Sequence, residues 1–236
     1  MRHYRISTYP LEAPVSMRLA VVADLHNQQG VAAAEAVRSL SPDAVLIVGD
    51  LFETPPRKNY FRYDEAVAFL RALSGIPMFY SRGNHDFQLP AEMKEVMEAC
   101  GVVCLFDSYT SFRGIWIGGL TSAQFEKGKV PNLDFLNAFA SLDGYKLILS
   151  HHPEYFRHIQ PLPIHLTVSG HAHGGQWRLF GQGIYSPGQG LFPKYTSGLY
   201  HGARLLVSRG MKVYTPPVPR LWNPPEILLL SLSSET

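Results

Sequence analysis

The sequence predicts a layered α/β protein in which helices flank two β-sheets. In the first half of the chain, short apolar runs alternate with helical segments, a βαβ rhythm that implies a largely parallel sheet with right-handed crossovers. The second half carries strand-like runs separated by glycine-rich turns, which indicates a second sheet of more antiparallel or mixed type. The 236 residues are 46% apolar and 17% charged, an ordinary globular composition that excludes a disordered or collagen-like chain.

Each element follows from its local pattern. Apolar and β-branched runs indicate strands, and apolar residues at helical spacing indicate helices. In the first half we expect strands over 17–23, 43–49, 76–81 and 102–106, and helices over 31–40, 63–73 and 91–100. In the second half we expect one helix over 132–142 and strands over 112–120, 145–153, 164–173, 183–187 and 203–210.

The chain is expected to form a single domain over residues 1–236, because no linker, repeat or low-complexity run interrupts it. Its proline-rich tail, from about residue 215 to 236, is expected to wrap the body as an irregular arm. The sequence makes no prediction of the oligomeric state.

Charge, cysteine content and hydropathy exclude several classes of protein. The net charge of +2 argues against a strongly basic surface for nucleic acid. Cys100 and Cys104 have no common zinc or redox spacing and are expected to be buried thiols. The sequence contains no apolar stretch long enough for a signal peptide or a membrane span, so a cytoplasmic location is expected.

Clusters of polar side chains follow five of the strand-like runs. They are Asp24 with His26, Asp50, Asn84-His85-Asp86, His151-His152, and His171 with His173. In open α/β sheets, ligands gather at the loops that follow the carboxyl ends of strands, so these five loops are expected to meet in one crevice.

Single clusters of this kind also have ordinary structural interpretations. Asp24 and Asp50 could each be a turn or capping residue. The Gly-His-Ala-His run is more specific, because imidazoles at His171 and His173 point the same way on an extended segment. Together, five loops bearing carboxylate, amide and imidazole groups without thiolate predict a site for Mn, Fe or Zn rather than Ca or a cysteine-ligated zinc.

The order and spacing of these residues resemble a known family. Asp24-Leu25-His26, Gly49-Asp50, Gly83-Asn84-His85-Asp86, His151 and Gly170-His171-Ala172-His173 are similar to the five motifs of the calcineurin-like metallophosphoesterase superfamily. The continuation GHAHGGQ and the VSRG segment at 207–210 resemble the bacterial phosphodiesterase branch that includes YkuE and YaeI. The resemblance implies the metallo-dependent phosphatase fold, a four-layer αββα sandwich of two mixed sheets flanked by helices.

The resemblance also implies a site for two divalent transition metal ions (Mn, Fe or Zn). It assigns Asp24, His26 and His173 to one ion and Asn84, His151 and His171 to the other, with Asp50 bridging both. A hydroxide shared by two such ions attacks phosphorus. His85 is expected to face the scissile phosphate, where it stabilises charge or protonates the leaving group, while Asp86 or another carboxylate sets its tautomer and raises its pKa. The expected catalytic residues are therefore His85, Asp50 and Asp86.

Three further positions leave alternatives open. The pattern of strand, histidine, variable residue and proline favours His151 over His152 as the ligand, which leaves His152 facing the substrate or packed in the core. Arg82 is expected either to bind substrate phosphate or to face solvent, and His201 either to reach the pocket or to lie on the surface. Glu53 stands where many family members carry a second Asp, a position that is not a primary ligand in the family.

The expected function is hydrolysis of phosphodiester bonds in a small-molecule phosphate ester. Phosphomonoesterase activity is an alternative, because the Arg82-Gly83-Asn84-His85 run is similar to one in serine/threonine protein phosphatases. A non-catalytic binding or scaffold protein on the same fold is an alternative of another class. A mononuclear zinc hydrolase would need an HExxH-type run, which the sequence lacks.

Overall fold

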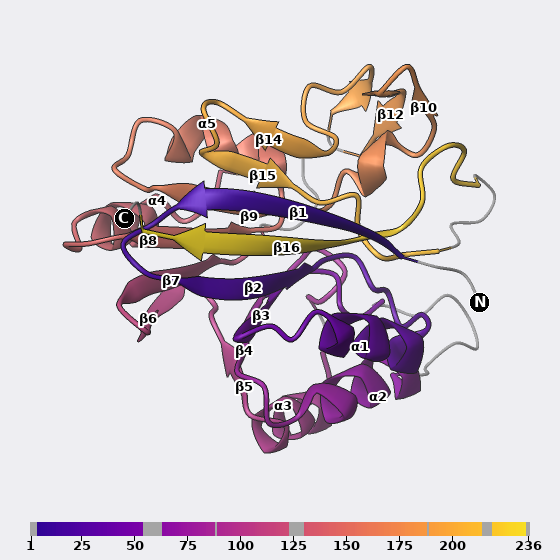
Figure 1. Ribbon diagram of the computed structural model, residues 1–236, viewed down its shortest axis with the longest axis horizontal. Coiled ribbons are helices and arrows are strands. Elements are labelled where there is room, and N and C mark those ends of the chain that lie inside the picture. The colour runs from indigo at the N-terminus through magenta and orange to yellow at the C-terminus, as the bar shows by residue number, and fades with distance from the viewer. Residues whose placement is uncertain are drawn as a thin grey trace.

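Two six-stranded sheets lie face to face and helices cover the outer side of each, as the sequence predicts (Figure 1). This architecture is seen in a computed structural model, which describes residues 4–53, 63–87, 89–122, 130–187, 189–213 and 219–234. The four layers are therefore helix, sheet, sheet and helix. The expected α/β sandwich is confirmed.

The first sheet contains the βαβ units of the first half of the chain. Its order is β1 (Arg5–Glu12), β16 (Glu226–Ser233), β2 (Met17–Val22), β3 (Ala44–Val48), β4 (Met78–Ser81) and β5 (Val102–Cys104). The strands β2 to β5 are parallel. The helices between them are α1 (Gly30–Ser39), α2 (Asp64–Leu73) and α3 (Ala91–Ala99). Each of these three helices lies within a few residues of its expected range.

The second sheet is mixed, with four parallel strands at its centre. Its order is β14 (Gly198–Tyr200), β15 (Leu205–Val207), β9 (Leu166–Ser169), β8 (Lys146–Ser150), β7 (Ile115–Leu120) and β6 (Ser108–Phe112). The edge strands β6 and β14 are antiparallel to their neighbours. The associated helices are α4 (Leu133–Ala140), η1 (Pro153–Tyr155), α5 (Phe156–Ile159) and η2 (His173–Gly175).

Two short hairpins extend from the second half of the chain beyond the sheets (Figure 1). The first joins β10 (Arg178–Leu179) to β11 (Gln182–Gly183), and the second joins β12 (Tyr185–Ser186) to β13 (Gly190–Leu191). The sequence predicted one strand over 183–187 here and no hairpins, because two-residue strands are too short to show a hydrophobic period.

The period-two alternation of the strands separates the core into layers. Along β2, Leu19 and Val21 belong to the core between the two sheets, whereas Ala20 and Val22 pack toward the helices of the first sheet. In β8, Leu149 likewise faces the first sheet, and its neighbour Ile148 packs with α4 and α5. Each central strand is buried on both faces, which explains why its sequence is continuously apolar.

The tail differs from its prediction. The irregular arm expected over 215–236 is wrong for Glu226–Ser233, which form β16 in the interior of the first sheet. β16 pairs with β1 in parallel and with β2 in antiparallel orientation. Its alternate leucines, Leu228, Leu230 and Leu232, enter the core between the sheets, and this burial outweighs the breaking effect of the prolines that precede it.

Leu230 provides a test of this strand, because it is fully buried where β16 pairs with Leu19 of β2. We expect Leu230→Ala to lower the free energy of unfolding by about 2–5 kcal/mol, since it removes buried methyl groups and leaves a cavity. Urea denaturation measures the change, with Ser233→Ala at the exposed end of the same strand as the control. Equal effects of the two substitutions would contradict the central position of β16.

Candidate metal centre

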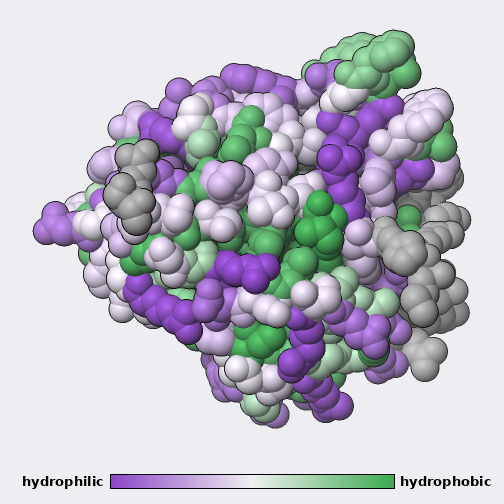
Figure 2. Space-filling model, in the orientation of Figure 1, coloured by the Kyte–Doolittle hydropathy of each residue, from purple (hydrophilic) through white to green (hydrophobic). Residues whose placement is uncertain are grey.

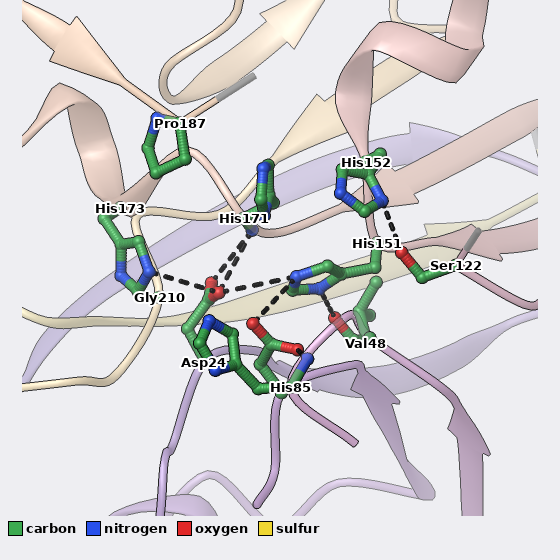
Figure 3. A network of polar contacts seen from close by, with 12 residues as sticks. Asp24, Val48, His85, Ser122, His151, His152, His171, His173, Pro187 and Gly210 are labelled. Carbon is green, nitrogen blue, oxygen red and sulfur yellow. Dashed lines mark hydrogen bonds and ion pairs between the residues drawn. The ribbon is translucent and has the colours of Figure 1, made fainter. Parts of the chain in front are cut away.

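The five polar loops meet where strands of both sheets end at their carboxyl termini (Figure 3). Asp24 follows β2, Asp50 follows β3, and Asn84 with His85 follows β4. From the second sheet, His151 follows β8, and His171 and His173 follow β9. The loops that the sequence predicts to meet therefore come from both sheets.

Several of these residues have an unusual backbone conformation. Asp24, His26, Asp50, His171 and His173 have φ between 45° and 65°, the left-handed region that side chains other than glycine rarely adopt. Such strain is retained where the surrounding structure fixes it, and it is common at functional sites.

Among the described residues, fully buried side chains form two adjacent groups of donor atoms, and a third group, His26 with the partly exposed Glu53 and His85, adjoins them. One consists of Asp24, His26 and His173 and the other of Asp50, His151 and His171; within each group the donor atoms lie within 4.8 Å of one another. His173 Nε2 lies 3.7 Å from Asp24 Oδ1, and His151 Nε2 lies 3.1 Å from Asp50 Oδ2. Asp50 Oδ2 also lies 3.6 Å from His26 Nε2, so this carboxylate connects the two groups.

Backbone hydrogen bonds fix the orientation of these side chains. His151 Nδ1 lies 2.8 Å from the carbonyl oxygen of Val48, which directs Nε2 toward the carboxylates. The amide of His171 donates to both oxygens of Asp24 at 3.1 Å. The amide of His85 donates to Asp50 Oδ1 at 2.8 Å, leaving Oδ2 directed into the cluster.

Two glycines allow the backbone to pass close to these carboxylates. A Cβ atom at Gly210 would lie 2.5 Å from Asp24 Oδ2, and a Cβ atom at Gly83 would collide with Asp50 Oδ1. Gly210 also has φ of 72°, which an L side chain rarely adopts. The VSRG segment noted in the sequence thus places its glycine directly against a member of the cluster.

The electrostatics of the cluster suit a cation. Burial raises the pKa of Asp24 to about 6, with the like charge of Asp50 adding to the effect. Burial disfavours a charge on His151, yet the carboxylates of Asp50 and Asp24 raise its pKa to about 10. The negative field that favours a proton on His151 would equally favour a divalent cation beside these carboxylates.

Buried donor atoms without a protein partner also fit a metal site. Among the described residues, Asn84 Oδ1 and His26 Nε2 are buried and have no hydrogen-bond partner. Leaving such groups unsatisfied costs about 1–3 kcal/mol each, a cost that coordination would remove. The donor atoms are oxygen and nitrogen. Such donors suit Mn, Fe and Zn, whereas softer metals favour sulfur ligands.

His85 stands at the edge of the cluster with its side chain 38% exposed. Its Nδ1 lies 3.0 Å from Glu53 Oε1, while the other oxygen of Glu53 lies 2.6 Å from His26 Nδ1 and 3.0 Å from Lys212 Nζ. Burial disfavours the charged form of His85, but the hydrogen bond to Glu53 and the charge of Asp50 raise its pKa. Glu53 therefore links His85 to a member of the first donor group.

Of the two alternatives predicted for the carboxylate beside His85, Asp86 or another one, the described contacts favour another one. Its Oδ2 accepts from the amides of Asp50 at 2.6 Å and Gly83 at 2.8 Å, and its Oδ1 accepts from the amide of Phe52 at 2.9 Å. Asp86 therefore fixes the Asp50 loop, and the carboxylate that contacts the His85 imidazole is Glu53. The local sequence favours Asp86 because it is adjacent to His85. It contains no sign that the chain turns Glu53 toward the His85 imidazole.

The three residues expected to bind substrate lie in different surroundings. The guanidinium of Arg82 lies 4.1 Å from the centre of the Phe106 ring, a cation–π contact. His152 is buried against His171, with its Nδ1 in contact with Ser122 Oγ. His201 Nε2 lies 2.8 Å from the hydroxyl of Tyr195, and the structure describes no contact between His201 and the two donor groups. Binding of substrate by these residues stays a prediction.

Segments beyond the five motifs complete the site, and motif analysis missed them. Asn223 donates to the carbonyl oxygen of His173 at 2.7 Å, and Arg220 donates to that of Arg209 at 2.7 Å. Arg220 Nη2 also lies 3.5 Å from His173 Nδ1, and burial lowers the pKa of Arg220 to about 10. Nothing local in this proline-rich segment distinguishes Arg220 and Asn223 from ordinary surface side chains.

The fold and this donor set are those of a metallophosphoesterase. Residues 17–175 match the family described as Calcineurin-like phosphoesterase, and the chain belongs to this family.

Similar proteins include the Bacillus subtilis metallophosphoesterase YkuE, which is 26% identical over 206 residues, 84% of this chain and 70% of YkuE. The Escherichia coli phosphodiesterase YaeI is 26% identical over 149 residues, 58% of this chain and 51% of YaeI. A crystal structure of TT1561 from Thermus thermophilus is 15% identical with a TM-score of 0.48, and covers 66% of this chain and 82% of that one. In the part of the chain that the structure describes, no helix combines the length and hydropathy needed to span a bilayer.

Proposed function

We propose that this protein is a dinuclear metal-dependent phosphoesterase that hydrolyses phosphodiester bonds. The observation that carries the proposal is the pair of adjacent donor groups connected by Asp50 Oδ2, with His85 exposed beside them. We assign Asp24, His26 and His173 to one ion, and Asn84, His151 and His171 to the other, with Asp50 between them. Mn, Fe and Zn all suit these donors.

A bound metal pair would supply Lewis acidity, activating water and polarising the phosphoryl oxygens. The protein supplies orientation and a proton. The amide of His85 fixes Asp50, and Glu53 holds the His85 ring at Nδ1, so we assign Nε2 to the substrate. The raised pKa of His85 favours the imidazolium, which stabilises charge on the phosphoryl group or protonates the leaving oxygen.

The preference for diesters is supported by the similarity to YaeI, whose name describes a phosphodiesterase. The monoesterase alternative depends on Arg82 binding phosphate, and the cation–π contact of its guanidinium with Phe106 adds no support to that role. A non-catalytic scaffold would have no need for a partly exposed histidine held by a carboxylate beside a complete donor set.

Metal loading and hydrolysis test the proposal together. Protein purified with Mn²⁺ is expected to contain two equivalents of transition metal by plasma emission and to hydrolyse bis(p-nitrophenyl) phosphate faster than p-nitrophenyl phosphate. Faster hydrolysis of the monoester would establish the alternative activity. A metal-loaded protein that cleaves neither ester would contradict catalysis and favour the scaffold.

Glu53→Gln is expected to lower kcat by about 10–100-fold, the usual effect of altering a residue that orients an active group. Glutamine keeps the size of the side chain but removes the charge that favours the His85 imidazolium and pairs with Lys212. The alkaline limb of the pH profile of kcat, where the His85 imidazolium loses its proton, should move to lower pH as the pKa of His85 falls, which a merely structural role would not cause. Glu92→Gln on the exposed surface of α3 is the control, and an unchanged pH profile in Glu53→Gln would contradict positioning by Glu53.

A further inference from the structure

The two hairpins after the metal-binding motifs expose an unusual set of large apolar side chains. Phe180 is 99% exposed, Trp222 76%, and Leu191 and Phe192 each 70%. Monomeric proteins rarely gather apolar groups at one place on the surface unless it binds something. We name this set the apolar tips, and its members are Trp177, Phe180, Tyr185, Leu191, Phe192 and Trp222.

Backbone hydrogen bonds join the apolar tips into one structural unit. The amide of Ile184 donates to the carbonyl oxygen of Trp177 at 2.9 Å, and the amide of Phe192 donates to that of Ile184 at 2.8 Å, which connects the two hairpins. The indole of Trp177 donates to the carbonyl oxygen of Pro219 at 2.9 Å, which holds the segment containing Trp222 beside them. Figure 2 shows apolar side chains at the projecting corner that β10 to β13 occupy in Figure 1.

This unit is attached to the metal-binding loop. The Ile184 amide also lies 3.1 Å from the carbonyl oxygen of Gly175 in η2, the turn that begins with His173. Inside the first hairpin, the buried guanidinium of Arg178 donates to the carbonyl oxygen of Gly174 at 2.7 Å. Figure 3 places Pro187, which follows β12, beside His173. The exposed tips are therefore held in place and lie next to the candidate metal centre.

The charge of the surrounding segment indicates what the tips contact. Residues 155–225 contain none of the 19 carboxylate side chains of the protein, but they contain seven Lys and Arg residues. Lys194, two residues from Phe192, is exposed, and no carboxylate side chain occurs in this segment to neutralise it. A surface that combines an exposed lysine with exposed aromatic and aliphatic groups complements an anionic lipid interface.

The shape and composition of the tips also favour a bilayer. Phe180 projects from the turn between β10 and β11 and is 99% exposed, so it does not line a groove. Such a projecting apolar group enters a fluid interface without needing a matching pocket. Trp and Tyr prefer the level of the lipid headgroups, since their rings are apolar and their N–H or O–H groups are polar.

We propose that the apolar tips and the exposed Lys194 dock the protein on the surface of an anionic phospholipid bilayer. The hairpins enter the headgroup region and the donor groups of the metal centre face that surface. The proposal does not depend on catalysis, because binding requires only the exposed tips and the local charge.

Vesicle sedimentation tests this docking. Wild-type protein is expected to sediment with vesicles containing about a third phosphatidylglycerol in phosphatidylcholine, and to bind pure phosphatidylcholine at least about tenfold more weakly. Raising the salt from about 0.1 M to about 0.5 M should weaken binding to the anionic vesicles, because it screens the basic side chains.

The variant Phe180→Asp/Leu191→Asp is expected to lower the partition coefficient for anionic vesicles by at least about tenfold, since it removes apolar groups and adds charges that the lipid repels. Leu133→Asp is the matched control, because Leu133 is 44% exposed on α4. Neither variant alters a residue of the donor groups, so their hydrolysis of soluble bis(p-nitrophenyl) phosphate should equal that of the wild type. Absence of that hydrolysis in the wild type would concern the proposed function and leave the docking result standing.

Three results would overturn the docking proposal. The first is the absence of wild-type binding to anionic vesicles, and the second is equal binding by wild type and the double variant. The third is a dimer in light scattering that the double variant abolishes without any vesicle binding, which would assign the tips to contact between two copies of the chain.

Discussion

Replacing His85 with alanine is expected to lower kcat for diester hydrolysis by about 10²–10⁴-fold, the usual contribution of a general acid. The two metal ions should remain bound, because His85 lies outside both donor groups that we assign to them. Its partly exposed side chain leaves little to collapse when it is removed, so the folded structure should persist.

The identity of the leaving group tells which role His85 has. If His85 protonates the leaving oxygen, the loss should be larger for a diester with an alkyl alcohol leaving group than for bis(p-nitrophenyl) phosphate, whose leaving group departs without a proton. If it stabilises the phosphoryl charge, the losses should be similar for both esters. Plasma emission verifies the metal content, and His158→Ala on α5 is the control. A fully active His85→Ala variant would contradict both roles.

Replacing Asp50 with asparagine is expected to have the largest effect on both metal binding and activity. Asp50 Oδ2 is the atom that connects the two donor groups, so the variant should lose at least one ion. We expect kcat to fall by at least about 10³-fold, beyond the 10–100-fold typical of residues that only orient a ligand. Metal content per chain and diester hydrolysis measure the two effects.

The metal-free form distinguishes this loss from misfolding. In the metal-free protein burial disfavours the charge of Asp50, yet the neighbouring histidines, His151 above all, hold the pKa of Asp50 well below its usual value, so the Asp50 carboxylate stabilises the fold. In the presence of a chelator, Asp50→Asn should therefore still unfold in one cooperative transition, but at a temperature below that of the wild type. Asp143→Asn, at an exposed position, is the control. Absence of a cooperative transition in chelated Asp50→Asn would attribute the loss to misfolding, and two bound metals with full activity would contradict the bridging assignment.

The sequence predicts the loops of the site well, because each motif follows an apolar run and strands of this kind end at a common edge. The βαβ units were equally clear from their periodicity. Glu53 and Arg220 could not be assigned in the same way, since their contacts with His85 and His173 arise only when segments distant from those residues meet.

The final strand shows a different limit. Prolines at 216, 217, 219, 224 and 225 indicate irregular backbone. Those at 219, 224 and 225 lie in the described approach to β16, which is irregular as expected, and those at 216 and 217 lie outside the described residues. The place of a strand in a sheet depends on which other strands are free to pair with it, and this cannot be read from local sequence. Only the folded structure shows that Glu226–Ser233 lie between β1 and β2.

The location of β16 constrains the order in which the molecule can be completed during synthesis. Ribosomes deliver the chain from its N-terminus, so β1 and β2 emerge long before the strand that separates them. Leu19 of β2 can pair with Leu230 only after β16 has been synthesised. Asp24, just beyond β2, packs against Gly210, which also lies late in the sequence. A nascent chain can therefore form its βαβ units early, but it cannot complete the candidate metal centre and the sheet beneath it until residues 226–233 have left the ribosome.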